Sequence, residues 1–263
     1  MSIPIFVVDA FTDTAFKGNP AGVCLLPEAK DAAWMQNVAA EMKHAETAFL
    51  VRSAEGFDLR WFSPAVEINL CGHATLASAH TLYREQQARP DEEIRFFTRS
   101  GELRARKDGD MIVLDFPARP AKEAVPPPYL LDALNVKAQF VGRSADDYLV
   151  AVASASEVRN LDPDLEKLRT LSVRGVIVTA PADKVGVDFV SRFFAPGAGI
   201  DEDPVTGSAH CCLAVYWSGK LHKTEFIAHQ LSPRGGVLHV TLAGERVLLG
   251  GHAVTVLKGS LLA

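Results

Sequence analysis

The stretch RFFAPGAGIDEDPVTGSAH (192–210) repeats, in the second half of the chain, a pattern already present in RWFSPAVEINLCGHAT (60–75). Both segments begin with arginine, an aromatic residue, phenylalanine, a small residue and proline. Both continue through a polar loop that contains an acid and then open an alanine-rich apolar segment with a glycine. The two arginines are 132 residues apart and the two glycines 135, so the second loop is three residues longer. Because internal repeats indicate architecture, the sequence predicts two similar domains.

The bulk composition is that of an ordinary soluble globular protein. The chain has 263 residues, of which 48% are hydrophobic and 22% charged, which is ample for buried cores and excludes extensive disorder. Its length accommodates two domains of common size. The net charge of −5 and the absence of any run of lysine and arginine exclude a nucleic-acid surface, which needs clustered positive charge.

The N-terminal segment and the cysteines indicate a cytoplasmic location. The segment MSIPIFVVDAF (1–11) has no basic residue before its apolar run and therefore does not resemble a secretory signal. No stretch approaches the roughly 20 apolar residues that span a bilayer, so we expect no membrane association. The four cysteines (Cys24, Cys71, Cys211 and Cys212) are too few and too irregularly spaced for a disulfide framework or a paired CxxC metal site. Reduced thiols are expected.

Hydrophobic periodicity and turn residues predict the same order of elements in both halves. Residues 31–43 show helical spacing behind a capping aspartate, Asp31. The segments GHATLASAHTLYREQQ (72–87) and GSAHCCLAVYWSGK (207–220) begin with uncharged turns, which predicts buried helices. Each follows a strand that ends in arginine, an aromatic residue and phenylalanine. We therefore expect an α/β (α+β) fold in which a curved mixed or antiparallel sheet wraps around a central helix, built twice.

A proline-rich segment predicts the domain boundary. Five prolines lie between Phe116 and Leu130, a density suited to an extended linker. The predicted organisation is an N-terminal repeat domain (1–117), a linker (118–129) and a C-terminal repeat domain (130–263).

The starts of the two buried helices, Gly72 and Gly207, are candidate binding positions for an anion. Unpaired backbone N–H groups and the positive end of the helix dipole lie at a helix N-terminus, and a glycine lets a ligand approach closely. Each glycine could instead be a simple turn residue. Their occurrence at equivalent places in a repeat favours two sites for a carboxylated substrate.

Four motifs together resemble the PhzF-like family of phenazine biosynthesis, within the diaminopimelate-epimerase superfamily. They are VDAFTDTAFKGNPAGV (8–23), KHAETAFLV (43–51), RWFSPAVEINLCGHAT (60–75) and DEDPVTGSAH (201–210). The resemblance implies two pseudo-symmetric domains of the diaminopimelate epimerase-like fold and a cofactor-free active site in the cleft between them. It also implies that Glu46 is the proton-shuttling acid/base, with His73, Asp203 and Ser208 around the substrate and Asn19 as a further polar residue.

The residues themselves allow both functional and structural interpretations. Glu46 precedes a strand-like apolar run, so its carboxylate would be partly desolvated, and desolvation raises a carboxyl pKa toward a range useful for proton transfer. A glutamate at a strand start is more often exposed, and Asp203, before a proline, could only cap a loop. His73 could cap its helix, but its mirror position holds Ser208, which places hydrogen-bonding groups at both helix starts.

Two alternatives to a cofactor-independent isomerase of a small carboxylated metabolite remain. Racemases of the superfamily use two cysteines, and Cys71 stands at one such position, whereas Thr206 occupies the equivalent place in the second half. A thiol-dependent epimerase or racemase therefore lacks its second thiol. The other alternative is a non-catalytic carboxylate-binding protein.

No cofactor or metal is expected. The segment PGAGIDE (196–202) lacks the third glycine of a dinucleotide-binding loop, and no βαβ pattern follows it. His73 and His80 are seven residues apart, about 10 Å along a helix, which is too far for one metal ion. The expected partner is a small-molecule carboxylate, and a homodimer is left open.

Overall fold

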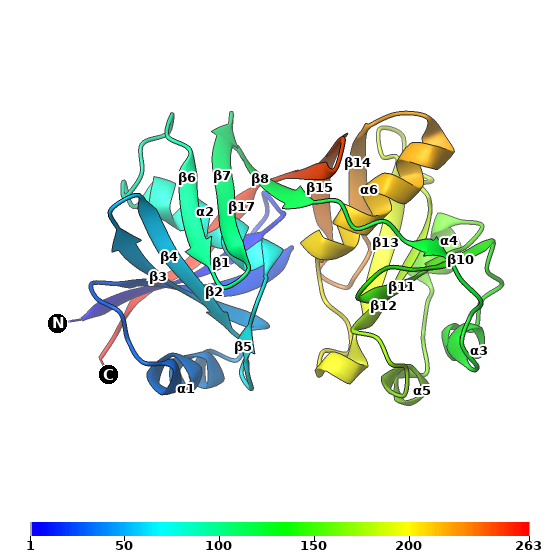
Figure 1. Ribbon diagram of the computed structural model, residues 1–263, viewed down its shortest axis with the longest axis horizontal. Helices are drawn as coiled ribbons and strands as arrows, with labels where there is room; N and C mark the ends of the chain where they lie inside the picture. Colours follow the sequence, from blue (N-terminus) through cyan, green and yellow to red (C-terminus); the bar gives the residue numbers. More distant parts are fainter. Residues whose placement is uncertain (1, 263) are drawn as a thin grey trace. The chain divides into compact units, whose positions relative to one another are not determined.

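The computed structural model describes residues 2–262, and the chain divides into two compact units (Figure 1). Unit 1 comprises Met1–Asp115 and Gly250–Ala263, and unit 2 comprises Phe116–Leu249. Unit 2 differs at both ends from the predicted C-terminal domain (130–263): it begins at Phe116, before the predicted linker, and it ends at Leu249. The last strand belongs to unit 1 because it pairs with the first, and the proline-rich segment belongs to unit 2, where Ala124 N–H donates to the carbonyl of Val141.

Unit 1 is built on a mixed sheet. Its strands are β1 (Ile3–Ala10), β2 (Asn19–Leu26), β3 (Glu46–Ser53), β4 (Gly56–Phe62), β5 (Glu67–Ile68), β6 (Ile94–Thr98), β7 (Gly101–Asp108), β8 (Met111–Pro117) and β17 (Ala253–Leu261). They pair in the order β17–β1–β2–β3–β4–β6–β7–β8, with β5 added to β4. The β2–β3 and β4–β6 pairs are parallel and the others are antiparallel.

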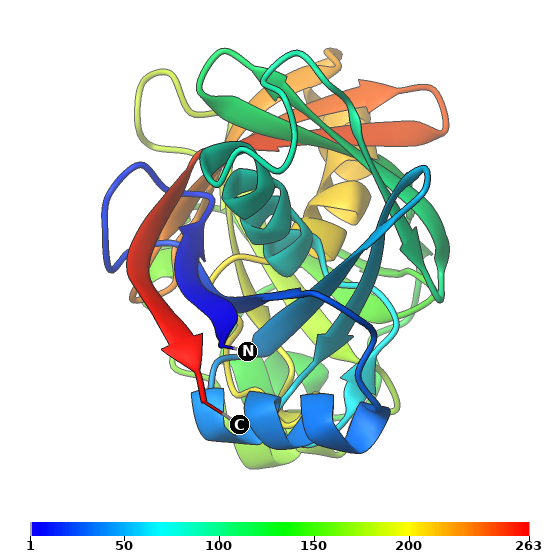
Figure 2. The same ribbon diagram turned by 90° about the vertical axis from the view of Figure 1, so that its left-hand side faces the viewer.

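Two helices cover opposite faces of this sheet. The central helix α2 (Gly72–Arg84) is buried without interruption from His73 to Ala79, and it contacts β1, β2, β3, β7 and β17. Figure 2 shows it enclosed by the strands. The second helix, α1 (Ala32–Met42), packs Met35, Val38 and Ala39 against Phe49 on the other face. Asp31 caps α1 as predicted, by accepting the Trp34 N–H at 2.7 Å.

In the sheet of unit 2, as in that of unit 1, parallel and antiparallel strand pairs alternate. Its strands are β9 (Lys122–Glu123), β10 (Phe140–Arg143), β11 (Asp147–Ala151), β12 (Gly175–Pro181), β13 (Phe189–Phe194), β14 (Glu225–Gln230), β15 (Gly236–Ala243) and β16 (Arg246–Gly251). The β11–β12 and β13–β14 pairs are parallel, and β9–β10, β10–β11, β12–β13 and β14–β15 are antiparallel. The order parallel, antiparallel, parallel, antiparallel along β2–β3–β4–β6–β7 thus recurs along β11–β12–β13–β14–β15.

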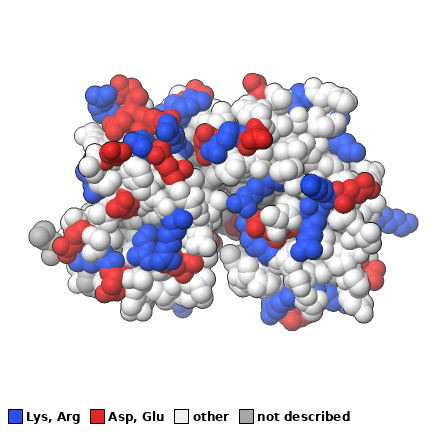
Figure 3. Space-filling view, in the orientation of Figure 1, with Lys and Arg blue, Asp and Glu red and all other residues white. Residues whose placement is uncertain are grey.

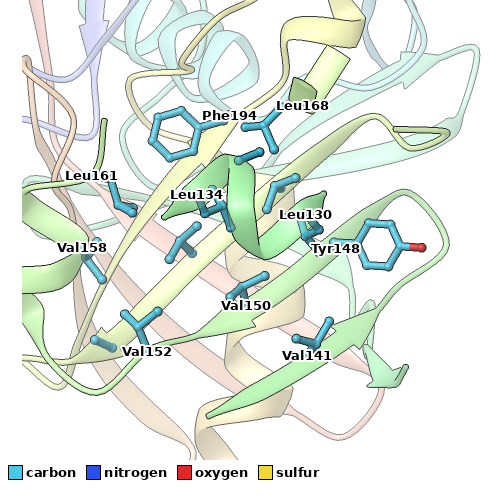
Figure 4. Close-up of a cluster of buried hydrophobic side chains, with 14 of the residues drawn as sticks. Leu130, Leu134, Val141, Tyr148, Val150, Val152, Val158, Leu161, Leu168 and Phe194 are labelled. Carbon is cyan, nitrogen blue, oxygen red and sulfur yellow. The ribbon is translucent and has the colours of Figure 1, made fainter. Parts of the chain in front are cut away.

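The central helix of unit 2 is α6 (Gly207–Leu221), which carries no charge before Lys220. Its Trp217 donates from Nε1 to Thr179 Oγ1 at 3.0 Å and stacks on Phe189 at 5.5 Å between ring centroids. The other face of the sheet is covered by α3 (Leu130–Leu134), α4 (Ala155–Arg159) and α5 (Leu165–Arg169). Figure 4 shows their shared core, in which Leu130 and Leu134 join Val150 of β11 and Phe194 of β13.

The predicted fold class is therefore confirmed: each unit is a curved mixed sheet around one buried helix. Within residues 2–262, no helix has both the length and the apolar character needed to cross a membrane. On the face drawn in Figure 3, basic and acidic side chains are interspersed over both units. All four cysteines are buried and unbridged.

The structure also explains the repeated sequence pattern. Arg60, in β4, donates from Nε and Nη2 to the two carboxylate oxygens of Glu67 at 2.7 and 2.8 Å. Arg192, in β13, makes the same two contacts with Glu202 at the same distances. In both units this pair ties the strand end to the loop that leads into the central helix. Glu67, the acid before the first central helix, and Glu202, one of three acids before the second, are thus structural partners of the repeated arginine. The Arg60 guanidinium lowers the pKa of Glu67.

The two pairs differ in burial, so their removal should have unequal effects. Arg192→Met should lower the free energy of unfolding by about 3 kcal/mol, because the Arg192 side chain is only 10% exposed and its loss removes the donors to both Glu202 and the carbonyl of Leu161. Arg60→Met should cost about 1 kcal/mol, because Arg60 is 30% exposed and Arg99 stays 2.7 Å from Glu67. Urea unfolding of both variants measures the difference, and equal losses would contradict this account.

The stability of the protein should fall in mild acid through His210 of α6. Burial lowers the pKa of His210 to about 4, whereas an unfolded histidine titrates near 6.5. Between these two pKa values, His210 is protonated in the unfolded chain but not in the folded protein. The free energy of unfolding therefore decreases by up to about 1.4 kcal/mol for each unit by which the pH falls. Chemical denaturation from pH 7 to pH 4 tests this. The slope should be smaller in His210→Gln and unchanged in His222→Asn, because His222 is exposed. The prediction fails if His210→Gln keeps the full slope.

Candidate active site

Three predicted or neighbouring residues meet at the start of α2 and form the unit 1 cluster, defined as Glu46, Cys71 and His73. Glu46 is the first residue of β3 and is 8% exposed, whereas His73 is the second residue of α2 and is 4% exposed. His73 Nε2 lies 3.1 Å from Glu46 Oε2. Its other ring nitrogen, Nδ1, lies 3.5 Å from the sulfur of Cys71. The imidazole therefore bridges a carboxylate and a thiol in a buried line.

This line suits proton transfer better than metal binding. One ligand atom from each of the three residues lies within 4.8 Å of the others, a spacing close enough for a metal ion to be considered. A single ion, however, bonds only one nitrogen of an imidazole, and here the thiol and the carboxylate approach opposite nitrogens. Protons can occupy both positions at once. The absence of a metal remains a prediction that this geometry supports.

The protonation of the unit 1 cluster follows from its burial and from the charges that its members present to one another. Burial and the Glu46 carboxylate raise the pKa of the Cys71 thiol to about 11, so the thiol keeps its proton at neutral pH. Burial disfavours a charged imidazole, yet the facing groups of Cys71 and Glu46 raise the pKa of His73 well above its usual value. His73 Nε2 and Glu46 Oε2 lie at ion-pair distance, but neither atom has a hydrogen-bond partner within residues 2–262.

The GNPAG turn places Asn19 at the end of the sheet where the parallel strands β2 and β3 both begin, which is also the position of Glu46. Asn19 begins β2, and Ala21, two residues further on, is in parallel register with Glu46. Gly18 has φ +65°, and an added Cβ would lie 2.2 Å from the carbonyl oxygen of Ala10, so the turn requires glycine. The side chain of Asn19 is completely buried.

The unit 2 cluster, defined as Asp203, Thr206, Ser208 and Gln230, lies at the start of α6. Gly207 and Ser208 are the first two residues of α6, as Gly72 and His73 are of α2. The Thr206 hydroxyl donates to Asp203 Oδ2 at 2.6 Å. Gln230, at the end of β14, donates to the carbonyl of Asp203 at 2.7 Å. The structure thus places Glu46, His73, Gly72 and Asn19 in unit 1, and Asp203, Gly207 and Ser208 in unit 2.

Sequence reasoning missed two side chains of unit 2. Arg174 donates from Nη1 to Ser208 Oγ at 2.9 Å while its Nε donates to the buried Asp147 at 2.9 Å. A hydroxyl that accepts from a guanidinium keeps its own proton for another acceptor, which suits Ser208 to a carboxylate ligand. The second missed residue is Gln230. Neither residue belongs to a repeated motif, and only their positions in the fold reveal them.

Comparison with known proteins agrees with the fold and the predicted resemblance. The fold is that of diaminopimelate epimerase-like proteins, and a hydroxyproline epimerase from Agrobacterium vitis superposes on it with a TM-score of 0.66. That protein is only 10% identical, the alignment covers 99% of this chain and 92% of the epimerase, and the likeness concerns the fold alone. The family described as phenazine biosynthesis-like protein matches residues 8–259, and the chain belongs to this family.

Relatives of full length support an isomerase. An uncharacterized isomerase from Halalkalibacterium halodurans is 51% identical over 263 residues, which cover 100% of this chain and 99% of the relative. A crystal structure of a PhzF-family phenazine biosynthesis protein from Enterococcus faecalis has a TM-score of 0.96 at 40% identity and covers both chains completely. The resemblance to the PhzF-like family in the sequence motifs is thereby confirmed.

The thiols should be inert in the folded protein. Burial raises the pKa of Cys71 to about 11 and of Cys24, Cys211 and Cys212 to about 12. A disulfide reagent such as DTNB at pH 8 should therefore modify no cysteine until a denaturant is added, because the thiolate is the reactive form. A rapidly reacting thiol that disappears in Cys71→Ala would show instead an ionised Cys71, as a thiol-dependent epimerase requires.

Proposed function

We propose that the protein is a cofactor-independent isomerase that moves a proton within a small carboxylated metabolite. The observation that carries the proposal is the buried Glu46 carboxylate facing His73 Nε2 at 3.1 Å, beside the N-terminus of α2. A carboxylate in a water-poor site beside an ionisable imidazole can take and return a proton. The glycines at the starts of α2 and α6 suit backbone recognition of carboxylates.

The proposed reaction is an allylic shift with Glu46 as the single acid/base. The Glu46 carboxylate removes a proton from a carbon next to a double bond, and the electrons of that C–H bond form the new double bond. The electrons of the original double bond take the proton back from Glu46 at the far carbon. One C–H bond breaks and one forms, so no oxidant, reductant or cofactor is consumed. His73 and Asp203 are assigned to the catalytic group with Glu46, and Asn19, Gly72, Gly207 and Ser208 are assigned to substrate binding.

The structure gives less support to a thiol-dependent epimerase. Cys71 precedes α2 as Thr206 precedes α6, so the second proton carrier would be a hydroxyl that does not ionise near neutral pH. The raised pKa of Cys71 also opposes a role as a base. A non-catalytic carboxylate-binding protein would need the same helix starts, but it has no need for the buried contact between Glu46 and His73.

Deuterium incorporation from D₂O tests the proposal directly. Vinylacetate and dihydrobenzoate serve as probes for an allylic shift, and trans-4-hydroxy-L-proline serves as a probe for epimerisation. Glu46→Gln should slow exchange into the allylic probes at least ~10²-fold, because the amide cannot carry the proton. Cys71→Ala should stay within about one order of magnitude of the wild type, since it only repacks the helix start.

Three outcomes separate the alternatives. Exchange that survives in Glu46→Gln but is lost in Cys71→Ala would replace the isomerase with the thiol-dependent epimerase. Binding of the probes without any exchange would favour the non-catalytic protein. Dialysis against a strong chelator should leave exchange unchanged, and a loss restored by zinc would remove cofactor independence from the proposal.

A further inference from the structure

The residue before each central helix has an unusual role in this protein. Cys71 is the N-cap residue of α2, and Thr206 is the N-cap residue of α6. Both have extended backbone angles, as N-cap residues do, yet neither side chain accepts a hydrogen bond from the first turn of its own helix. Threonine is a common N-cap residue, so the missing capping hydrogen bond indicates that the Thr206 hydroxyl has a different partner.

The Thr206 hydroxyl is used instead to hold Asp203. It donates to Asp203 Oδ2 at 2.6 Å, and it accepts from Nε2 of Gln230 at 3.2 Å. Because a hydroxyl has a single proton, the donor contact from Gln230 leaves that proton for the carboxylate. A carboxylate only accepts, so the two contacts together orient the hydroxyl proton toward Asp203.

Gln230 connects Asp203 and Thr206 through hydrogen bonds to the backbone of both residues. Only 1% of this residue is exposed. Its Oε1 accepts the backbone N–H of Thr206 at 2.8 Å, and its Nε2 donates to the backbone carbonyl of Asp203 at 2.7 Å. A buried amide whose two ends bind both residues of a carboxylate–hydroxyl pair keeps them at a constant separation. Asp203 itself lies outside regular secondary structure, where a carboxylate would otherwise be poorly ordered.

We propose that Thr206 and Gln230 are positioning residues that fix the Asp203 carboxylate for the reaction. At the position that corresponds to the second thiol of a two-cysteine racemase, this chain therefore has Thr206. Its hydroxyl orients Asp203 and transfers no proton to the substrate. This inference rests on the proposed function of Asp203. Displacement of a catalytic group by about 1 Å from its productive geometry can cost up to about 10² in rate.

The experiment compares three variants, each of which changes the volume of one side chain only slightly. Thr206→Val keeps the shape and removes the hydroxyl, whereas Thr206→Ser keeps the hydroxyl. Ser232→Ala is the matched control, because Ser232 Oγ donates to the carbonyl of Pro204 at 2.8 Å and so anchors the same loop without touching the carboxylate. In crystal structures of the variants, Asp203 should occupy more than one rotamer in Thr206→Val and a single rotamer in Thr206→Ser and Ser232→Ala.

Kinetics of deuterium exchange into vinylacetate and dihydrobenzoate supply the second readout. Thr206→Val should lower kcat by about 10-fold or more with KM within about threefold, and Thr206→Ser should restore most of kcat. In the Asp203→Asn background, Thr206→Val should have no further effect, since the group that it orients is already gone. The Arg174 charge near Asp203 is the same in all variants.

The outcomes distinguish this inference from the proposed function. An unchanged Asp203 rotamer in Thr206→Val overturns the inference whether or not any probe exchanges. Equal disorder or equal loss of kcat in Ser232→Ala also overturns it, because loop anchoring alone would then explain the effect. If Asp203→Asn exchanges like the wild type while Thr206→Val still disorders the carboxylate, the orienting contact stands and the proposed role of Asp203 in the reaction fails.

Discussion

Arg192 donates to both carboxylate oxygens of Glu202, and Arg60 does the same to Glu67, so each unit closes one loop with a planar two-point contact. A guanidinium and a carboxylate match only in one plane, which makes the contact directional as well as attractive. The loop closed in this way leads directly to the first residue of the central helix. The glycine, the capping residue and the polar side chain that follow therefore have a defined position in both units.

This arrangement separates what the fold needs from what the chemistry needs. The strand-end arginine, the loop acid and the helix glycine are shared by the two units, and they set the backbone. The side chains at the next positions differ: Cys71 and His73 in unit 1 are matched by Thr206 and Ser208 in unit 2. One backbone plan thus presents an imidazole next to a carboxylate in one unit and a hydroxyl next to a guanidinium in the other.

The sequence predicted the repeated sheet and helix well because the signals are local. The uncharged turns after Gly72 and Gly207 indicated burial, and the structure shows both helices inside their sheets. The return of β17 to β1 left no such signal, because pairing between distant strands is decided by the whole sheet. Arg174 and Gln230 were missed for the same reason: each is far in the sequence from the helix start that it contacts. The family resemblance assigned Glu46 and His73 to one site, but it did not predict their contact, since a lone glutamate at a strand start has several common roles.

The pairing of β17 with β1 has a consequence for how the chain folds as it is made. Unit 2 is one continuous segment, so its strands and α6 are all available once residue 249 has been synthesised. Unit 1 is discontinuous: Ile3 pairs with Leu261, and β1 has only β2 beside it until the last strand arrives. During translation, β1 therefore presents an open edge to its surroundings while the whole of unit 2 is being synthesised. An open edge is a template for pairing with other chains, so the side of β1 that β17 covers in the folded protein is exposed to wrong pairing during that interval.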